Sequence, residues 1–177
     1  MNIVLFTLIV AGAPTVAPFE VLDEKTVDSW RSLKTTNRIE FTKKFFNYLN
    51  PATMNLVDDF YHPDSILLDP IGRQVGRKEV KDYYASIYGP VTSIVFEFGE
   101  TIEQGDRMSL PWTMHFKSKK LKRNKLISVE GISMIRFDKE TGQAIHHQDY
   151  YDVGAMVHEH IPVIGGLFRW VKKKLDH

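Results

Sequence analysis

The sequence predicts an α+β domain, with helices in the first half and a mostly antiparallel sheet in the second. In most of residues 35–88 the hydrophobic residues recur at about every 3.6 positions, and after Gly89-Pro90 they alternate with a period near two. The chain has 177 residues, of which 43% are hydrophobic and 25% are charged. This length and composition suit one globular domain with its own core.

Proline and glycine divide the helical half. Residues 19–33 show no clean periodicity and are interpreted as an arm or short helix. The aromatic-rich segment after Thr35 is expected to be helical until Asn50-Pro51, because the residue before a proline disfavours helix. The elements expected next are a short helix at 52–61, a strand at 65–68, a break at 69–72 and a helix at 77–88.

Four strands are expected in the second half, at residues 93–103, 107–117, 126–137 and 144–153. Short runs of turn-forming residues separate the first strand from the second and the third from the fourth. The basic stretch 117–125 falls between the second and third strands. It is interpreted as a solvated hairpin loop in preference to a binding patch.

The pattern divides the chain into an apolar segment and arm at 1–34, a domain at 35–153 and a helical extension at 154–177. Residues 1–17 have the length of a signal-peptide core, but no Lys or Arg precedes them, and prolines follow the candidate cleavage sites. A cytoplasmic location is therefore favoured, with secretion as the alternative. The basic, amphipathic extension is expected to pack on its own domain or on a dimer mate, and contact with a membrane surface is less favoured.

Composition excludes several classes of function. The formal charge is +1, so no broad field attracts nucleic acid. The chain has no cysteine, which rules out disulfides and thiolate chemistry. No glycine-rich nucleotide loop and no Gly-x-Ser-x-Gly nucleophile motif occurs. We therefore expect no nucleic-acid partner and no cofactor.

Two segments resemble known families. Residues 41–72 look like the opening of the ketosteroid isomerases: a helix with aromatic residues, a second helix, and a strand that ends in Asp-Pro-x-Gly. Residues 131–153 resemble the SnoaL-like and limonene-epoxide-hydrolase-like proteins, whose last strand carries a pattern that appears here as Gln-Asp-Tyr-Tyr-Asp. Over residues 35–175 the chain thus resembles the NTF2-like superfamily, which implies a conical α+β fold around a pocket for a small apolar molecule.

The resemblance also implies roles for two carboxylates. Asp69 falls on the general base of the isomerases, and Asp149 falls on the water-activating base of the hydrolases. The two groups that hold the enolate oxygen in the isomerases look like Phe45 and Ser133 here, so that oxyanion site is missing. The charged pair that protonates the epoxide in the hydrolases is missing too, since the matching region reads Trp112-Thr-Met114.

Alternation along the last strand places His147, Asp149 and Tyr151 on one face. We expect Asp69 to reach the same pocket from the opposite wall, so that a catalytic set of Asp69, Asp149 and His147 forms. Asp69 is the preferred base, although an aspartate before Pro and Gly is also an ordinary turn former. The expected ligand-binding residues are Tyr151, Trp112, Met114, Phe116, Phe45, Tyr48 and Ser133. No metal site is expected, because two adjacent histidines and Asp149 lack further ligands.

Three functions remain open at this point. The first is a cofactor-free isomerase, cyclase or hydrolase that acts on a lipid-, steroid- or polyketide-like molecule through a carboxylate base. The second is a carrier or sensor that binds a small apolar molecule without turnover. The third is an interaction module in which the open face of the sheet and the last helix form a homodimer or a docking surface.

Overall fold

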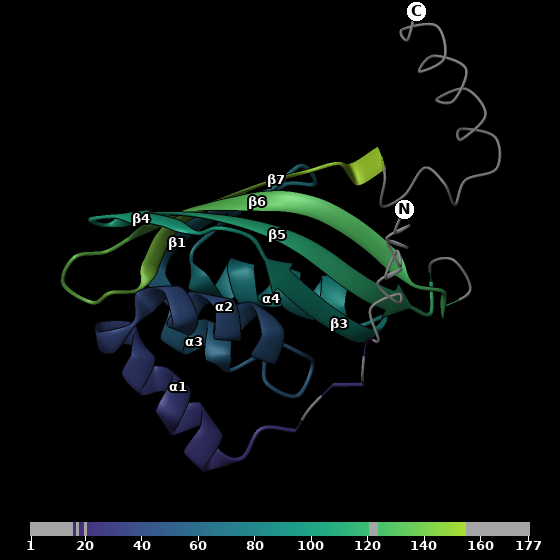
Figure 1. Ribbon diagram of the computed structural model, residues 1–177, viewed down its shortest axis with the longest axis horizontal. Helices are drawn as coiled ribbons and strands as arrows, with labels where there is room; N and C mark the ends of the chain where they lie inside the picture. The colour runs from purple at the N-terminus through teal and green to yellow at the C-terminus, as the bar shows by residue number, and fades with distance from the viewer. Residues whose placement is uncertain (1–15, 17, 20, 121–123, 155–177) are drawn as a thin grey trace, which may run out of the picture.

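The computed structural model describes residues 16, 18–19, 21–120 and 124–154. In Figure 1 the sheet curves over a layer of helices, with α2 (Arg38–Tyr48), α3 (Leu56–Phe60) and α4 (Arg77–Tyr88) beneath it and α1 (Glu24–Thr36) below α2. Apart from two strands that lie between α3 and α4, the helices come first and the strands follow, as the change of period predicts. Of the expected helical extension at 154–177 only residue 154 is described, and of the apolar segment 1–17 only residue 16, so neither expectation is tested.

The N-terminal helices meet at a residue that caps both of them. Helix α1 (Glu24–Thr36) begins at Asp23, whose carboxylate accepts a hydrogen bond from the N–H of Thr26, and ends at Asn37. Asn37 also caps α2 (Arg38–Tyr48) by accepting from the N–H of Glu40. The expected arm at 19–33 is therefore a regular helix from Glu24. A single tryptophan, Trp30, is its buried anchor.

A short helix and a strand follow without a loop between them. Helix α3 (Leu56–Phe60) runs directly into β1 (Tyr61–Leu68), which starts four residues earlier than expected. The break after β1 leads to β2 (Arg73–Val75), which pairs antiparallel with β1. Helix α4 (Arg77–Tyr88) has the bounds that the sequence predicts and ends at Gly89-Pro90.

The remaining strands form a curved sheet of mixed direction. They are β3 (Val91–Phe98), β4 (Ile102–Gln104), β5 (Arg107–Ser118), β6 (Ile127–Phe137) and β7 (Ala144–Tyr151). The order is β2-β1-β7-β6-β5-β3, with β4 paired to β5. All these pairs are antiparallel except that of β1 with β7, which is parallel. The strand expected at 93–103 is two strands, because the chain turns after Phe98.

Aromatic side chains fill the space between helices and sheet. Phe45 on α2 stacks on Phe60 with ring centroids 4.0 Å apart, and Trp30 stacks on Phe41 at 4.7 Å. The indole N–H of Trp30 donates to the carbonyl of Phe41 at 2.9 Å, so its buried polar atom is satisfied. This aromatic layer fixes α2 against the sheet.

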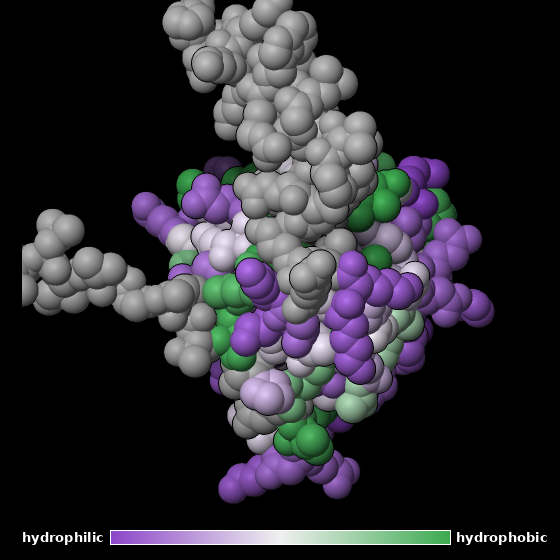
Figure 2. Space-filling view, turned by 90° about the vertical axis from the view of Figure 1, so that its right-hand side faces the viewer, coloured by the Kyte–Doolittle hydropathy of each residue, from purple (hydrophilic) through white to green (hydrophobic). Residues whose placement is uncertain are grey.

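Figure 2 shows a surface on which polar and charged side chains lie among smaller patches of apolar side chains. Single exposed apolar side chains are ordinary on globular proteins. None of the helices in the described part of the chain has the length and hydrophobicity needed to cross a bilayer.

Candidate functional site

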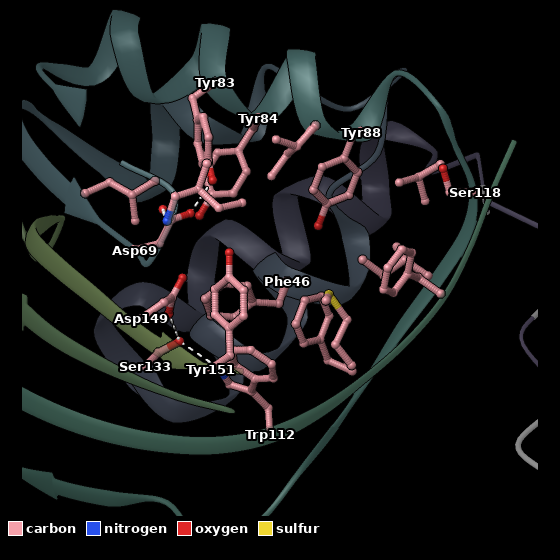
Figure 3. A pocket seen from close by; sticks show the side chains of 18 of the residues that line it. Phe46, Asp69, Tyr83, Tyr84, Tyr88, Trp112, Ser118, Ser133, Asp149 and Tyr151 are labelled. Carbon is pink, nitrogen blue, oxygen red and sulfur yellow. Dashed lines mark hydrogen bonds between the residues drawn. The ribbon is translucent and has the colours of Figure 1, made fainter. Parts of the chain in front are cut away.

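A cavity of about 340 Å³ lies between α4 and the face of the sheet that is turned toward the helices (Figure 3). Its volume is near the lower end of the range for pockets that hold drug-sized molecules. Most of its wall is apolar. The lining residues are Phe46, Leu67, Asp69, Ile71, Tyr83, Tyr84, Ile87, Tyr88, Pro90, Val91, Ile94, Phe96, Trp112, Met114, Phe116, Ser118, Lys120, Ser133, Asp149 and Tyr151.

Asp69 belongs both to a turn and to the cavity wall. Its Oδ1 accepts hydrogen bonds from the backbone N–H groups of Ile71 and Gly72, each at 2.8 Å. Its Oδ2 accepts from the hydroxyl of Tyr83 on α4. The side chain therefore forms the turn expected of Asp-Pro-x-Gly and still borders the cavity.

Asp149 is held through only one of its two oxygens. Its Oδ1 accepts from the hydroxyl of Ser133 at 2.5 Å and lies 2.9 Å from Nε2 of His147. Within the described residues its Oδ2 has no hydrogen-bond partner. The side chain is mostly buried, with 16% of it exposed, and it borders the cavity. One carboxylate oxygen is thus fixed by the sheet while the other is available to a ligand.

His147 lies behind Asp149 and does not border the cavity. Its side chain is completely buried, and its Nδ1 lies 2.5 Å from the hydroxyl of Tyr61. The Tyr61 hydroxyl in turn lies 2.8 Å from that of Tyr84. Burial raises the pKa of both phenols well above the ordinary value, so both keep their protons.

The contacts around His147 fit one tautomer of a neutral ring. When Nε2 carries the proton, Nδ1 is left to accept from the hydroxyl of Tyr61. The Nε2–H then donates to Asp149, whose Oδ1 accepts a second bond from Ser133. In this arrangement Tyr61 donates to His147, and a carboxylate at Asp149 accepts from both His147 and Ser133.

The sequence pattern did not single out Tyr61 or Tyr84. Buried tyrosines on a helix or at the start of a strand look like ordinary core residues, and their hydroxyl partners are set by tertiary packing. No local signal in the sequence distinguishes them from the other aromatic residues.

The two carboxylates come from neighbouring strands, so the expectation that Asp69 enters from the opposite wall is wrong. Leu67 and Leu68 of β1 pair in parallel with His147 and Gln148 of β7. Asp69 directly follows β1 and Asp149 directly follows Gln148, so both lie near the same end of this strand pair. Figure 3 shows Asp69 beside Tyr83 of α4 and Asp149 below it, on the sheet.

Two further tyrosines surround Asp69. Burial, followed by the hydrogen bond to Asp69, raises the pKa of Tyr83 far above its usual value. The pKa of Tyr151 is raised in the same direction by burial and then by the charges of Asp69 and Asp149. Both phenols therefore stay protonated near neutral pH and can donate hydrogen bonds.

Trp112 forms part of the wall and is tied to Asp149 through Ser133. Its indole N–H donates to the Ser133 hydroxyl at 2.9 Å, and its ring lies across Gly131 of β6. A methyl group on Gly131 would come within 2.3 Å of the Trp112 ring. The indole can occupy this place only because residue 131 has no side chain.

The other predicted ligand-binding residues fall into two groups. Tyr151, Trp112, Met114, Phe116 and Ser133 border the cavity. Phe45 and Tyr48 do not border it, so the prediction that these two residues line the ligand site is wrong. Phe45 is fully buried between Phe60 and the other rings of the core, and Tyr48, at the end of α2, packs against the same core.

No group of three or more His, Asp and Glu side chains among the described residues has the geometry to hold a metal ion. What the cavity offers is acid–base chemistry: a carboxylate with a free oxygen, a second carboxylate, and protonated phenols in an apolar surrounding.

Comparison with known proteins agrees with this architecture. The model of the SnoaL-like domain matches residues 42–147, more than half of the chain. The chain belongs to the SnoaL-like domain family. Its resemblance to NTF2-like proteins is confirmed as well, and no curated protein matches it.

Three solved structures illustrate the likeness of fold. A candidate SnoaL-like polyketide cyclase from Shewanella putrefaciens is 18% identical with a TM-score of 0.56, over 64% of this chain and 88% of that one. An NTF2-like protein of unknown function from Burkholderia pseudomallei is 17% identical with a TM-score of 0.53, over 76% and 93%. TerC, co-crystallised with polyporic acid, is 22% identical with a TM-score of 0.52, over 61% and 85%. At these identities the matches show the fold alone.

Proposed function

We propose that this SnoaL-like chain is a cofactor-independent enzyme that moves a proton on a small, largely apolar molecule bound in the cavity. The observation that carries the proposal is the free Oδ2 of Asp149 beside a second carboxylate, Asp69, in an otherwise apolar wall. A general base must reach the proton that it removes, and Asp149 offers an unoccupied oxygen to the cavity. His147 positions this base from behind.

The residues that line the cavity indicate the class of substrate. Aromatic and aliphatic side chains cover most of the cavity, which favours a lipid-, steroid- or polyketide-like molecule with few polar atoms. A protein of the same fold was co-crystallised with polyporic acid, and others are candidate polyketide cyclases. These neighbours support an aromatic or polyketide-like ligand for this chain.

The proposal can be tested before the substrate is identified. Enolisable ketones of suitable size, such as 1-tetralone, exchange the hydrogens next to the carbonyl for deuterium in D₂O when a base removes them. We expect the wild-type protein to accelerate this exchange, measured by the loss of the proton NMR signal. Asp69→Asn/Asp149→Asn should return it to the rate seen without protein.

Asp64→Asn is the matched control, because the Asp64 side chain is 88% exposed and lies away from the cavity lining. It should exchange the ketone like wild type. Exchange that survives in the double variant would show that the two carboxylates are not the bases and would refute the proposal.

A second candidate function is a carrier that binds without turnover. It is favoured by Phe45, which stands where the isomerases have an oxyanion donor and is enclosed in the core. A carrier would bind 1-tetralone or polyporic acid, detected by native mass spectrometry and thermal shift, and leave the rate of deuterium exchange unchanged.

A further inference from the structure

Four tyrosines border the cavity. The hydroxyl of Tyr83 donates to Asp69 and that of Tyr84 is paired with Tyr61, while the pKa of Tyr151 is raised by burial and then by the nearby charge of Asp69. The hydroxyl of Tyr88 has no partner within the part of the chain that the structure describes. Figure 3 shows it pointing into the cavity.

The hydroxyl of Tyr88 is open to the cavity. Only 4% of the whole residue is exposed, yet its hydroxyl oxygen is not fully buried, so it is accessible from the cavity that the residue borders. A phenylalanine would line the same wall without a polar atom. The hydroxyl therefore gives a largely apolar wall a hydrogen-bond donor that a bound molecule can use.

The ring of Tyr88 is well fixed. It is the last residue of α4, its edge packs against Tyr84 with ring centroids 6.1 Å apart, and Gly89-Pro90 ends the helix behind it. Burial and then the charge of Asp149 raise the pKa of Tyr88, so the phenol stays protonated and acts as a donor.

We propose that Tyr88 is the polar anchor of the cavity and donates a hydrogen bond to a carbonyl oxygen of the ligand. This inference rests on the proposed function and narrows the substrate to apolar ketones, quinones or related carbonyl compounds. Bound in this way, the carbonyl lies between Tyr88 and the sheet, with its neighbouring carbon turned toward Asp149.

The chemistry of such a complex balances without a further reactant. Oδ2 of Asp149 takes a proton from the carbon next to the carbonyl, and the electron pair of that C–H bond forms the C=C bond of an enolate. The carbonyl π pair moves to oxygen, where the O–H of Tyr88 stabilises the new charge. The proton on Asp149 then returns to carbon and regenerates the carboxylate.

A matched pair of ligands tests the anchor by binding alone. 2-Acetylnaphthalene carries a carbonyl, whereas 2-ethylnaphthalene has nearly the same shape without it. We expect Tyr88→Phe to weaken binding of the ketone about threefold to tenfold, the value of one neutral hydrogen bond, and to leave the hydrocarbon unchanged. Binding is measured by naphthalene fluorescence, and the carbonyl stretch of the bound ketone should move to higher frequency in the variant.

Tyr150→Phe is the control, because Tyr150 is exposed on the other face of the sheet. It should keep the wild-type ratio of the two dissociation constants. Tyr88→Phe should also unfold at the same temperature as wild type or higher, because it removes a hydroxyl that bonds no described residue.

The outcomes separate this inference from the proposed function. If Tyr88→Phe leaves both the ratio of the two dissociation constants and the carbonyl stretch unchanged, Tyr88 does not bind the carbonyl. That result would leave the proposed proton transfer by Asp149 intact. A lower unfolding temperature would assign the hydroxyl a structural partner and also overturn the role of Tyr88 as anchor. If neither naphthalene binds the wild type, the cavity itself does not take ligands of this kind, which contradicts both proposals.

Discussion

Asp69 and Asp149 stand near the same end of one strand pair, but their surroundings differ. Asp69 uses both oxygens, accepting two backbone N–H groups and the Tyr83 hydroxyl, whereas Asp149 uses only Oδ1. A base needs an oxygen that the substrate proton can reach, and only Asp149 has one without a protein donor. The residue that best matches a family motif is therefore not the one best placed to take a proton.

The largest effect should come from single substitutions of the two carboxylates. We expect Asp149→Asn to slow deuterium exchange of 1-tetralone by about 100-fold or more, the usual contribution of a general base. Asp69→Asn should slow it by no more than about tenfold, because asparagine still accepts the backbone bonds of the turn. The exchange rates are measured by NMR, and a larger loss in Asp69→Asn would reverse the assignment of the base.

The next largest effect is expected from a substitution that alters only the cavity wall next to Asp149. Gly131→Ala would force the Trp112 ring away from the 2.3 Å contact, break its bond to Ser133 and push it into the cavity. We expect the free energy of unfolding to fall by about 1–3 kcal/mol, as for other overpacked sites, and the binding of 2-ethylnaphthalene to weaken. Urea unfolding and fluorescence titration measure the two effects.

Gly72→Ala is the matched control for this substitution. Its φ lies outside the left-handed region, and an added methyl group would meet only the end of the flexible Gln74 side chain, at 3.3 Å. Its stability should stay within about 0.5 kcal/mol of wild type. Equal effects of the two glycine substitutions would show that the Trp112 contact has no special importance.

A smaller effect is expected from the phenol behind His147. Tyr61→Phe leaves Nδ1 of His147 without its donor, so the free energy of unfolding should fall by about 1–2 kcal/mol. The proton of the ring should no longer be confined to Nε2, which imidazole ¹⁵N NMR detects directly. As a control, Tyr48→Phe removes a hydroxyl outside the cavity lining and should change neither the free energy of unfolding nor the ¹⁵N spectrum. An unaltered ¹⁵N spectrum in Tyr61→Phe would mean that Tyr61 does not select the tautomer.

The smallest effect is expected from removing one of the hydrogen bonds that Asp69 accepts. Tyr83→Phe removes one of its three donors and leaves both backbone bonds in place. A partly buried hydrogen bond contributes about 0.5–1.5 kcal/mol, so a modest loss of stability is expected. If Asp69 is the secondary carboxylate, the exchange rate of 1-tetralone stays within about threefold of wild type; a collapse of the rate would give Asp69 the leading role.

Local patterns in the sequence were enough to predict the class of the fold and several of its elements. Helix α4 has the predicted bounds because Gly89-Pro90 ends it, and β5 and β6 differ from expectation by one residue each. The first half of β1 was missed because His62-Pro63 looks like a turn, while the structure continues the strand through it. The sequence predicts only an arm or short helix where α1 lies, because a helix that buries a single residue, Trp30, has a weak hydrophobic pattern.

The candidate site was predicted only where alternation along one strand decides orientation. His147, Asp149 and Tyr151 share a face because side chains on a strand alternate. Whether β1 pairs with β7, and in which direction, depends on the folding of the whole chain, so the relation of Asp69 to Asp149 could not be derived from either segment. The partners of Tyr61, Tyr84 and Tyr88 depend on the same packing, which no periodicity encodes.

The parallel pairing of β1 with β7 also has a consequence for the order of events during synthesis. β1 leaves the ribosome early and β7 is the last strand of the sheet, yet Asp69 and Asp149 become neighbours only when these two strands meet. Until β7 is released, β1 has its antiparallel neighbour β2 but an unpaired opposite edge. The nascent chain therefore carries an incomplete sheet and no assembled carboxylate pair until β7 has been made.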